Sequence, residues 1–125
     1  MTLGSCETSR GHVAGSNALR AIAGVLRRQA RDTDLVVRYG GDEFVALLPH
    51  TGLADARVFG KRVLLEVAAL RPDGMPVTAS IGVASLTRPS TLESDELLLG
   101  RADRAAYRAK AAGGNRICVD DEEPT

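Results

Sequence analysis

Two apolar segments separated by a pair of glycines constrain this chain of 125 residues most strongly. Residues Asp34–Tyr39 and Phe44–Leu48 are rich in Val, Leu and aromatic side chains, which are typical of β-strands. Gly40 and Gly41 lie between them, and glycine adopts the positive φ of a tight primed turn without steric cost. The pattern predicts a β-hairpin with Asp42 and Glu43 directly beyond its turn.

Helical periodicity appears in three other segments. Apolar residues recur every three to four positions over residues 16–31, 53–70 and 94–112, and each segment predicts an amphipathic helix. Two further β-type runs, Val77–Leu86 and Arg116–Val119, complete the pattern. The resulting order is helix, strand, strand, helix, strand, helix and strand. It predicts one α+β domain whose mostly antiparallel sheet is covered by helices.

The composition excludes several classes of protein. Sixteen Lys and Arg residues balance sixteen Asp and Glu residues, so no net positive charge is present to attract a nucleic acid polymer. Aromatic residues make up 3% and Trp is absent, which leaves few side chains for stacking on bases. No apolar run approaches the ~20 residues of a membrane span, and two distant cysteines are too few for a structural zinc site. We expect a cytoplasmic domain without a membrane segment.

The predicted hairpin carries the densest chemical signal. Asp42 and Glu43 offer hard oxygen ligands of the kind that Mg²⁺ (or Mn²⁺) prefers. Gly40 and Gly41 leave the backbone bare, so that a ligand can approach it closely. Magnesium held there would bridge phosphates and orient a hydroxyl group for in-line attack. The alternative is a solvated hairpin whose acidic side chains keep a sheet edge soluble.

Residues 11–119 resemble the GGDEF domain of diguanylate cyclases in five ordered blocks. The blocks are Gly11-His12-x-x-Gly15, Arg38-Tyr39-Gly40-Gly41-Asp42-Glu43-Phe44, Thr78-Ala79-Ser80-Ile81-Gly82-Val83-Ala84, Ala102-Asp103-x-x-x-Tyr107-x-Ala109-Lys110 and Gly113-x-Asn115-Arg116. The resemblance implies a nucleotidyl-cyclase-like sheet of the ferredoxin or palm type (βαββαβ), flanked by helices. It also implies a bacterial signalling reaction in which two GTP condense to cyclic di-GMP with release of two pyrophosphates. The family works as a homodimer, attached to other signalling domains.

The same resemblance assigns roles to residues of the hairpin. Asp42 matches the metal ligand of the family's active site, and Glu43 matches its neighbour, which supports metal binding or activation of the hydroxyl group. Gly40 and Gly41 match the backbone that lies against the nucleotide. Lys110 matches a lysine that contacts phosphate.

A second site is implied by Arg31-Asp32-Thr33-Asp34, because the family's inhibitory product site is an R-x-x-D just before the G-G-D-E-F strand. A guanidinium fork suits phosphate and the guanine Hoogsteen edge, while a carboxylate accepts hydrogen bonds from guanine N1 and the amino group. Arg62 matches the arginine that completes this site. The alternative is an exposed helix end where Arg31 interacts with the helix dipole.

The N-terminal residues depart from the family's pattern. The family begins D-x-D-x-F-K-x-x-N-D-x-x-G-H, and counting back from Gly11 places its first aspartate before Met1. We therefore expect that residues 1–10 do not conform, that the first strand is missing or truncated, and that the domain spans residues 11–119 with an acidic tail at 120–125. Ser16 and Gly114 also replace a carboxylate and an arginine of the family.

These departures affect the expected function. Each lost charge-assisted contact costs about 1.5–3 kcal/mol, so several together weaken GTP binding strongly. We expect a diguanylate-cyclase-type domain that binds cyclic di-GMP through Arg31 and Asp34 and synthesises it weakly or not at all. The alternative is a degenerate GGDEF domain that acts only as a receptor for cyclic di-GMP or GTP. Arg101, Arg104 and Arg108 are predicted to line a solvated helix face.

Overall fold

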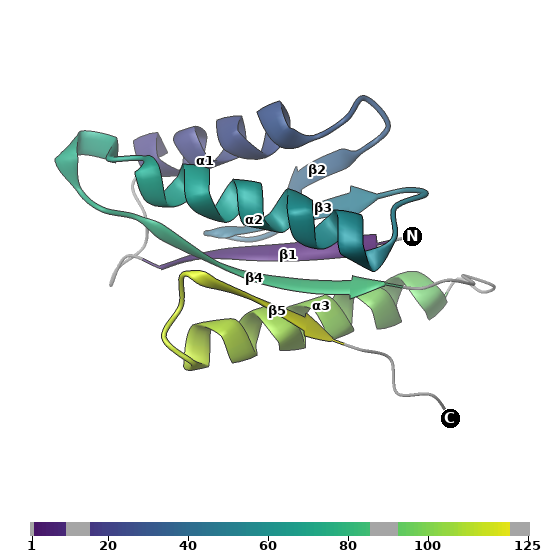
Figure 1. Ribbon diagram of the computed structural model, residues 1–125. Helices are drawn as coiled ribbons and strands as arrows, with labels where there is room; N and C mark the ends of the chain where they lie inside the picture. The colour runs from purple at the N-terminus through teal and green to yellow at the C-terminus, as the bar shows by residue number, and fades with distance from the viewer. Residues whose placement is uncertain (1, 10–15, 86–92, 121–125) are drawn as a thin grey trace.

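The computed structural model describes residues 2–9, 16–85 and 93–120 (Figure 1). Its elements alternate between strands and helices. In chain order they are β1 (Thr2–Ser9), α1 (Ser16–Gln29), β2 (Leu35–Arg38), β3 (Glu43–Leu48), α2 (Leu53–Ala69), the short 3₁₀ helix η1 (Pro72–Gly74), β4 (Thr78–Ser85), α3 (Glu93–Ala111) and β5 (Arg116–Asp120). The predicted helices and strands are confirmed, with ends that move by one or two residues.

The strands form one five-stranded sheet in the order β2-β3-β1-β4-β5. Neighbouring strands are antiparallel, apart from β4 and β5, which are parallel. The α+β fold is therefore confirmed. Among the described residues, no helix is both long enough and apolar enough to cross a membrane.

Of the two expectations for the first strand, missing or truncated, the first was wrong, because residues Thr2–Ser9 form a strand. Strand β1 lies in the middle of the sheet and pairs with β3 on one side and β4 on the other. Its register places Glu7 opposite both Glu43 and Ser80. Matching a motif compares the identities of side chains. A central strand is held by hydrogen bonds of its backbone N–H and C=O groups to both neighbouring strands, and these groups are the same for nearly all residues. Residues 2–9 thus supply a strand although they lack the family's motif.

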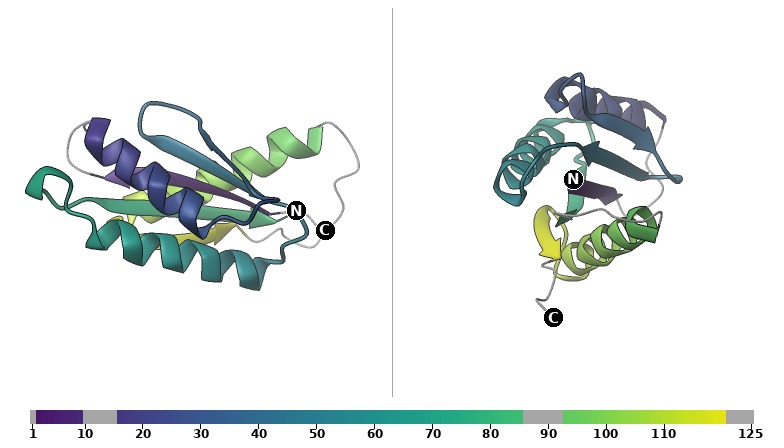
Figure 2. Two further views of the ribbon diagram at one scale, coloured as in Figure 1. Left: turned by 90° about the horizontal axis from the view of Figure 1, so that it is seen from above. Right: turned by 90° about the vertical axis from the view of Figure 1, so that its right-hand side faces the viewer.

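Helices cover both faces of the sheet (Figure 2). α1 and α2 lie on one face, where Ile22, Val25, Val63 and Val67 are fully buried against the strands. α3 lies on the opposite face and packs closely because its buried side is alanine-rich. At Gly82 of β4, an added Cβ would overlap backbone atoms of this helix, so only glycine permits the approach.

The end of α3 explains the glycine that replaces an arginine of the family. Gly113 and Gly114 have φ of 122° and 74°, in the region that favours glycine. The Gly114 N–H donates to the Ala109 carbonyl at 2.9 Å, and the Gly113 N–H donates to the Lys110 carbonyl at 3.1 Å. Gly114 therefore terminates the helix.

One of the three α3 arginines differs from the predicted solvated face, whereas Arg104 and Arg108 are exposed as predicted. Arg101 is only 5% exposed, and its guanidinium donates to Asp120 of β5 and to the Ser85 carbonyl. Arg104 and Arg108 also approach the Asp120 carboxylate, at 3.6 and 3.7 Å. Asp120, which we assigned to the acidic tail, belongs to the last strand of the sheet.

Candidate functional site

The hairpin between β2 and β3 has a connection of four residues, Tyr39–Asp42. The N–H groups of Tyr39 and Gly40 both donate to the Glu43 carbonyl, at 2.8 and 3.3 Å. Neither Gly40 nor Gly41 has a positive φ. The predicted hairpin is confirmed, but the prediction of a tight primed turn was wrong, because the longer connection closes without left-handed residues.

Arg38 fixes the shape of this connection. Its Nε lies 3.2 Å from the Gly40 carbonyl oxygen and 3.1 Å from that of Gly41, and Nη2 donates to the Gly41 carbonyl at 2.5 Å. The planar guanidinium thus turns two successive carbonyls toward β2. The glycine segment is exposed, with open space where a Gly41 side chain would be.

The two acidic residues lie at the start of β3. Asp42 and Glu43 are both half-buried, and the Glu43 carboxylate folds under the glycine segment, with Oε1 3.9 Å from the position of a Gly40 Cβ. Their oxygens are the hard donors that Mg²⁺ takes. Within residues 2–9, 16–85 and 93–120, no group of three His, Cys, Asp or Glu side chains gathers into a metal cage. Two carboxylates alone do not complete the octahedral shell of Mg²⁺, so such an ion would need further oxygen ligands.

A cavity of about 330 Å³ lies beside the hairpin, between α1 and strands β2 and β3. Three cationic side chains, Arg20, Arg27 and Arg38, line it together with apolar residues. The apolar residues are Leu19, Ala23, Val36 and Phe44. Every charged side chain among the described residues that line the cavity is cationic, so the cavity suits a ligand that combines a flat apolar part with negative charge. We did not predict Arg20 and Arg27, although their spacing of seven places both on one helix face.

A second cavity, of about 230 Å³, brings the predicted product-site residues together. Arg31 follows α1, Asp34 precedes β2 and Arg62 projects from α2, and all three line this one space. Thr51 and Asp55, at the start of α2, line it as well. Sequence reasoning missed both, because only the packing of α1 against α2 brings them near Arg31.

Asp34 is the most buried charged group of this cavity. Its side chain is 2% exposed, and Oδ2 accepts a hydrogen bond from the Arg31 N–H at 2.8 Å. The Arg31 Nε lies 3.5 Å from the same oxygen. Oδ1 is buried and has no hydrogen-bond partner among the described residues. A carboxylate oxygen without a partner is costly in a protein interior unless a ligand supplies a donor.

Thr51 holds the other end of Arg31. The Arg31 Nη2 donates to Thr51 Oγ1, and this hydroxyl group donates to the Pro49 carbonyl at 3.0 Å. The guanidinium is thus fixed between Asp34 and Thr51 while its side chain stays 60% exposed. An oriented and accessible guanidinium is suited to binding a phosphate.

The remaining predicted residue, Lys110, lies elsewhere. It is an exposed residue of the last turn of α3, on the opposite face of the sheet from α1 and α2. Both cavities therefore lie on the face of the sheet that α1 and α2 cover, and Lys110 lies on the other face. His12 falls outside the described residues.

Comparison with known proteins gives one consistent result. The family of the diguanylate cyclase GGDEF domain matches residues 5–116. The chain is 39% identical over 113 residues to the diguanylate cyclase DgcP of Pseudomonas aeruginosa, covering 87% of this chain and 16% of the relative. It is 44% identical over 108 residues to the diguanylate cyclase DgcM of Escherichia coli, covering 86% and 26%. The chain thus spans about a quarter or less of these curated relatives.

Solved structures agree with this result. The GGDEF domain of DgcB from Caulobacter crescentus, solved in complex with c-di-GMP, has a TM-score of 0.84 at 25% identity, covering 97% of this chain and 78% of that one. The GGDEF domain of YfiN from Pseudomonas aeruginosa has a TM-score of 0.83 at 30% identity, covering 98% and 83%.

Proposed function

Because this chain belongs to the diguanylate cyclase GGDEF domain family, we propose that the cavity around Arg31, Asp34 and Arg62 binds cyclic di-GMP. One observation carries the proposal: the buried Oδ1 of Asp34 has no donor among the described residues, in a space that two arginines line. The guanine N1–H and amino groups would donate to Asp34, and the fork of Arg31 would bind phosphate or the Hoogsteen edge. A solved neighbour that contains c-di-GMP supports the choice of ligand.

Calorimetry with cyclic di-GMP tests this proposal. We expect Arg31→Ala and Asp34→Ala each to weaken binding by at least about tenfold, since each removes a charge-assisted hydrogen bond. Arg62→Ala should weaken binding as well. Arg57→Ala is the matched control, because Arg57 is an exposed arginine of the same helix that does not line the cavity. Equal affinities in Arg62→Ala and Arg57→Ala, together with unchanged binding in Arg31→Ala, would place the ligand elsewhere.

The hairpin is proposed to be the GTP site. Asp42 and Glu43 would hold Mg²⁺ (or Mn²⁺), which neutralises phosphate charge when bound. Gly40 and Gly41 would let the nucleotide lie against the backbone. The phosphate contact of Lys110 stays a prediction, because Lys110 lies on the face of the sheet opposite α1 and α2. The neighbouring cavity with its three arginines offers space for the rest of the nucleotide. In the family's reaction, the 3′-hydroxyl of one GTP attacks the α-phosphorus of another and pyrophosphate leaves.

We propose that synthesis by this chain is weak or absent. Ser16 stands in place of a carboxylate, and Gly114 is committed to ending α3. The family's first aspartate has no counterpart in residues 2–9, which form β1. A charge-assisted contact contributes about 1.5–3 kcal/mol, so loss of two or three lowers GTP affinity by orders of magnitude.

A metal titration tests the hairpin separately from turnover. We expect GTP to bind more tightly with Mg²⁺ than without it, and Asp42→Asn to remove most of this difference, on the order of tenfold. Asp32→Asn, an equal charge change at an exposed position outside both cavities, is the control. A Mg²⁺ effect that survives in Asp42→Asn would remove this residue from the metal site.

The second candidate function is a receptor that binds cyclic di-GMP or GTP without converting GTP. It is favoured by the complete product cavity combined with the altered N-terminal residues. Incubation with GTP and Mg²⁺ followed by chromatography separates the two functions: cyclic di-GMP in the eluate indicates the enzyme, and its absence alongside measurable ligand binding indicates the receptor. We further propose a cytoplasmic setting, attached signalling domains and a homodimer when GTP is bound.

A further inference from the structure

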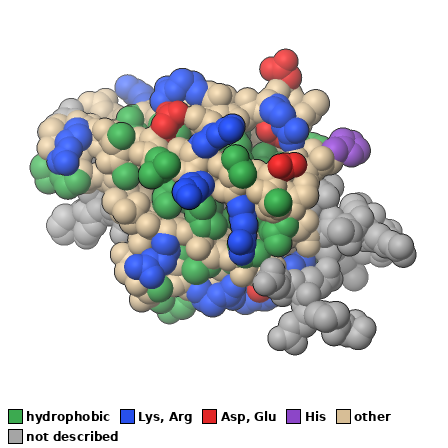
Figure 3. All heavy atoms as spheres, viewed as in Figure 1, with side chains coloured by type: hydrophobic (Ala, Val, Ile, Leu, Met, Phe, Trp, Pro, Cys, Tyr) green, Lys and Arg blue, Asp and Glu red, His purple; other side chains and the backbone are tan. Residues whose placement is uncertain are grey.

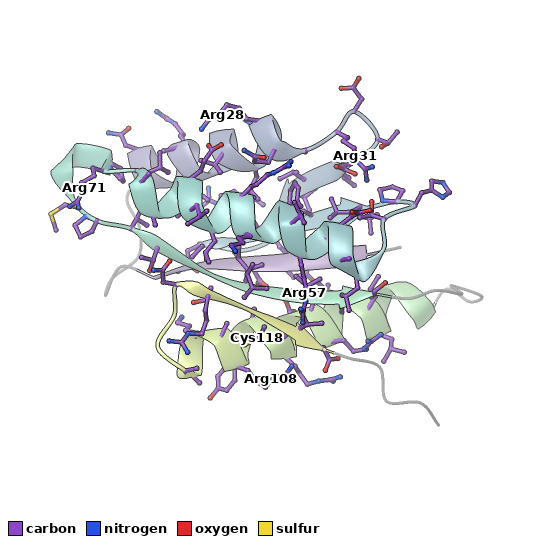
Figure 4. All side chains as sticks on the ribbon, in the orientation of Figure 1. Arg28, Arg31, Arg57, Arg71, Arg108 and Cys118 are labelled. Atoms are coloured by element: carbon purple, nitrogen blue, oxygen red, sulfur yellow. The ribbon has the colours of Figure 1, made fainter. Side chains whose placement is uncertain are left out.

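A cationic groove lies between α2 and the last strand, away from both nucleotide cavities. It has a volume of about 300 Å³ and is lined by Arg57 and Lys61 of α2 and by Ile117 and Val119 of β5. Figure 4 shows Arg57 extending from α2 toward β5. The two strand residues are half-buried and form an apolar floor below the two charged side chains.

The positive charges of this groove are not neutralised within the described part of the chain. Neither Arg57 nor Lys61 has an ion pair there, in contrast to Arg28, whose Nη2 lies 2.9 Å from Glu66 Oε2. Both side chains are exposed, and Figure 3 shows Lys and Arg side chains interspersed with hydrophobic ones on this face. Two neighbouring cationic side chains without an ion pair among the described residues attract an acidic partner.

The strand that forms one wall is an edge of the sheet. β5 pairs with β4 on one side, and the sheet as described ends there. Arg108 binds the Val119 carbonyl at 3.0 Å, and Arg101 binds the Asp120 carbonyl at 2.9 Å, so side chains already cover the end of β5. The backbone nearer Arg116 carries no such side-chain cap among the described residues. An edge strand with open backbone groups can pair with an added extended segment.

We propose that this groove binds an extended, acidic polypeptide segment of a partner protein. Acidic side chains of the segment would pair with Arg57 and Lys61, and apolar side chains between them would pack on Ile117 and Val119. Its backbone would run along the first part of β5. The apolar floor and the strand edge favour a polypeptide over a nucleic acid, whose phosphates would use only the charges. This proposal does not depend on the nucleotide sites.

Fluorescence anisotropy with a labelled peptide, Glu-Glu-Val-Glu-Val-Glu-Glu, tests the proposal at low salt. We expect saturable binding that weakens as salt is added, and amide shifts in an NMR spectrum centred on Ile117–Val119. Arg57→Glu should weaken binding by about tenfold or more, because it replaces attraction with repulsion. The peptide Glu-Glu-Ser-Glu-Ser-Glu-Glu should bind several-fold more weakly, since it lacks the apolar contacts.

Arg71→Glu is the matched control. Arg71 is an exposed arginine beyond the other end of α2, so the same charge change there should alter affinity by less than about twofold. Circular dichroism confirms that both variants are folded. The proposal is overturned if the peptide does not bind, if Arg57→Glu and Arg71→Glu weaken it equally, or if an oligothymidylate of equal charge binds as tightly and shifts the same amides.

Discussion

Arg101 of α3 and Asp120 of β5 form a buried ion pair, with Arg101 Nε 2.9 Å from Asp120 Oδ2. The side chains are 6% and 17% exposed. Arg101 also donates to the backbone carbonyls of Asp120 and Ser85, at 2.9 and 3.1 Å, and so joins the helix to the ends of two neighbouring strands. This pair fixes the last strand against α3.

Removal of Arg101 is expected to destabilise the domain. In Arg101→Ala, the Asp120 carboxylate loses its closest partner and keeps only the more distant Arg104 and Arg108, which costs about 1.5–3 kcal/mol. Arg104→Ala is the matched control, since Arg104 is 64% exposed and should cost no more than about 1 kcal/mol. Urea unfolding followed by circular dichroism measures both values. Similar free energies of unfolding in the two variants would contradict the structural role of Arg101.

A side chain at position 82 is expected to separate α3 from the sheet. An added Cβ in Gly82→Ala would overlap the Ala102 carbonyl oxygen and the Ala106 nitrogen, and backbone atoms have little freedom to move. The free energy of unfolding should fall by about 1–3 kcal/mol or more. Gly100→Ala provides the control, because no atom lies within 4 Å of its added Cβ, and it should stabilise α3 by about 0.5–1 kcal/mol. Thermal melting curves should show a lower melting temperature for Gly82→Ala and a higher one for Gly100→Ala than for the wild type.

The Thr51 hydroxyl group is expected to orient Arg31 for ligand binding. Thr51→Val keeps the shape of this buried side chain but removes the acceptor for Arg31 Nη2. Affinity for cyclic di-GMP should fall by about tenfold, as expected for one hydrogen bond to a charged group. Thr51→Ser, which keeps the hydroxyl group, should retain most of the affinity. Calorimetry measures the affinity of both variants for cyclic di-GMP. An equal loss of affinity in Thr51→Val and Thr51→Ser would mean that the hydroxyl group has no orienting role.

The stability of the α1–α2 contact is expected to depend on pH through Glu66. Hydrogen bonds from Arg28 and then from Gln29, at 2.9 and 2.5 Å, hold the pKa of this carboxyl below its ordinary value of 4.5. Because the folded pKa lies below the unfolded one, the stabilisation is fully present above the unfolded pKa and is lost as pH falls through the folded pKa. Glu66→Gln should therefore melt below the wild type near neutral pH.

The difference in melting temperature between the wild type and Glu66→Gln should shrink as the solution becomes acidic. Melting temperatures of the wild type and Glu66→Gln, recorded from neutral pH down to below 4.5, give the comparison. The other carboxyl groups titrate alike in both proteins and cancel in the difference. A melting difference that stays constant over this range would show that Glu66 contributes nothing that depends on its charge.

Much of the fold and part of the site could be predicted from the sequence. Apolar spacing gave the three helices, and β-type runs on either side of two glycines gave the hairpin. The spacing of Arg31 and Asp34 just before the hairpin indicated a second site, and the structure places both in one cavity with Arg62. These features depend on neighbours within a few positions along the chain, which local patterns describe well.

Features that join distant segments could not be predicted in this way. Motif counting assigned residues 1–10 no complete strand, yet backbone pairing with β3 and β4 places residues 2–9 in the middle of the sheet. Asp120 looked like part of an acidic tail until Arg101, nineteen positions earlier, was found beside it.

By itself, the sequence determined which helices and strands form and which family the residues resemble, because periodicity and motif spacing act over short distances. Only the tertiary structure decided that Arg31 donates to Thr51, and that a buried oxygen of Asp34 has no partner among the described residues. It also placed Arg57 and Lys61 beside an edge strand. Burial and hydrogen-bond partners are set by packing between segments, and the free energy of a charged group depends on both.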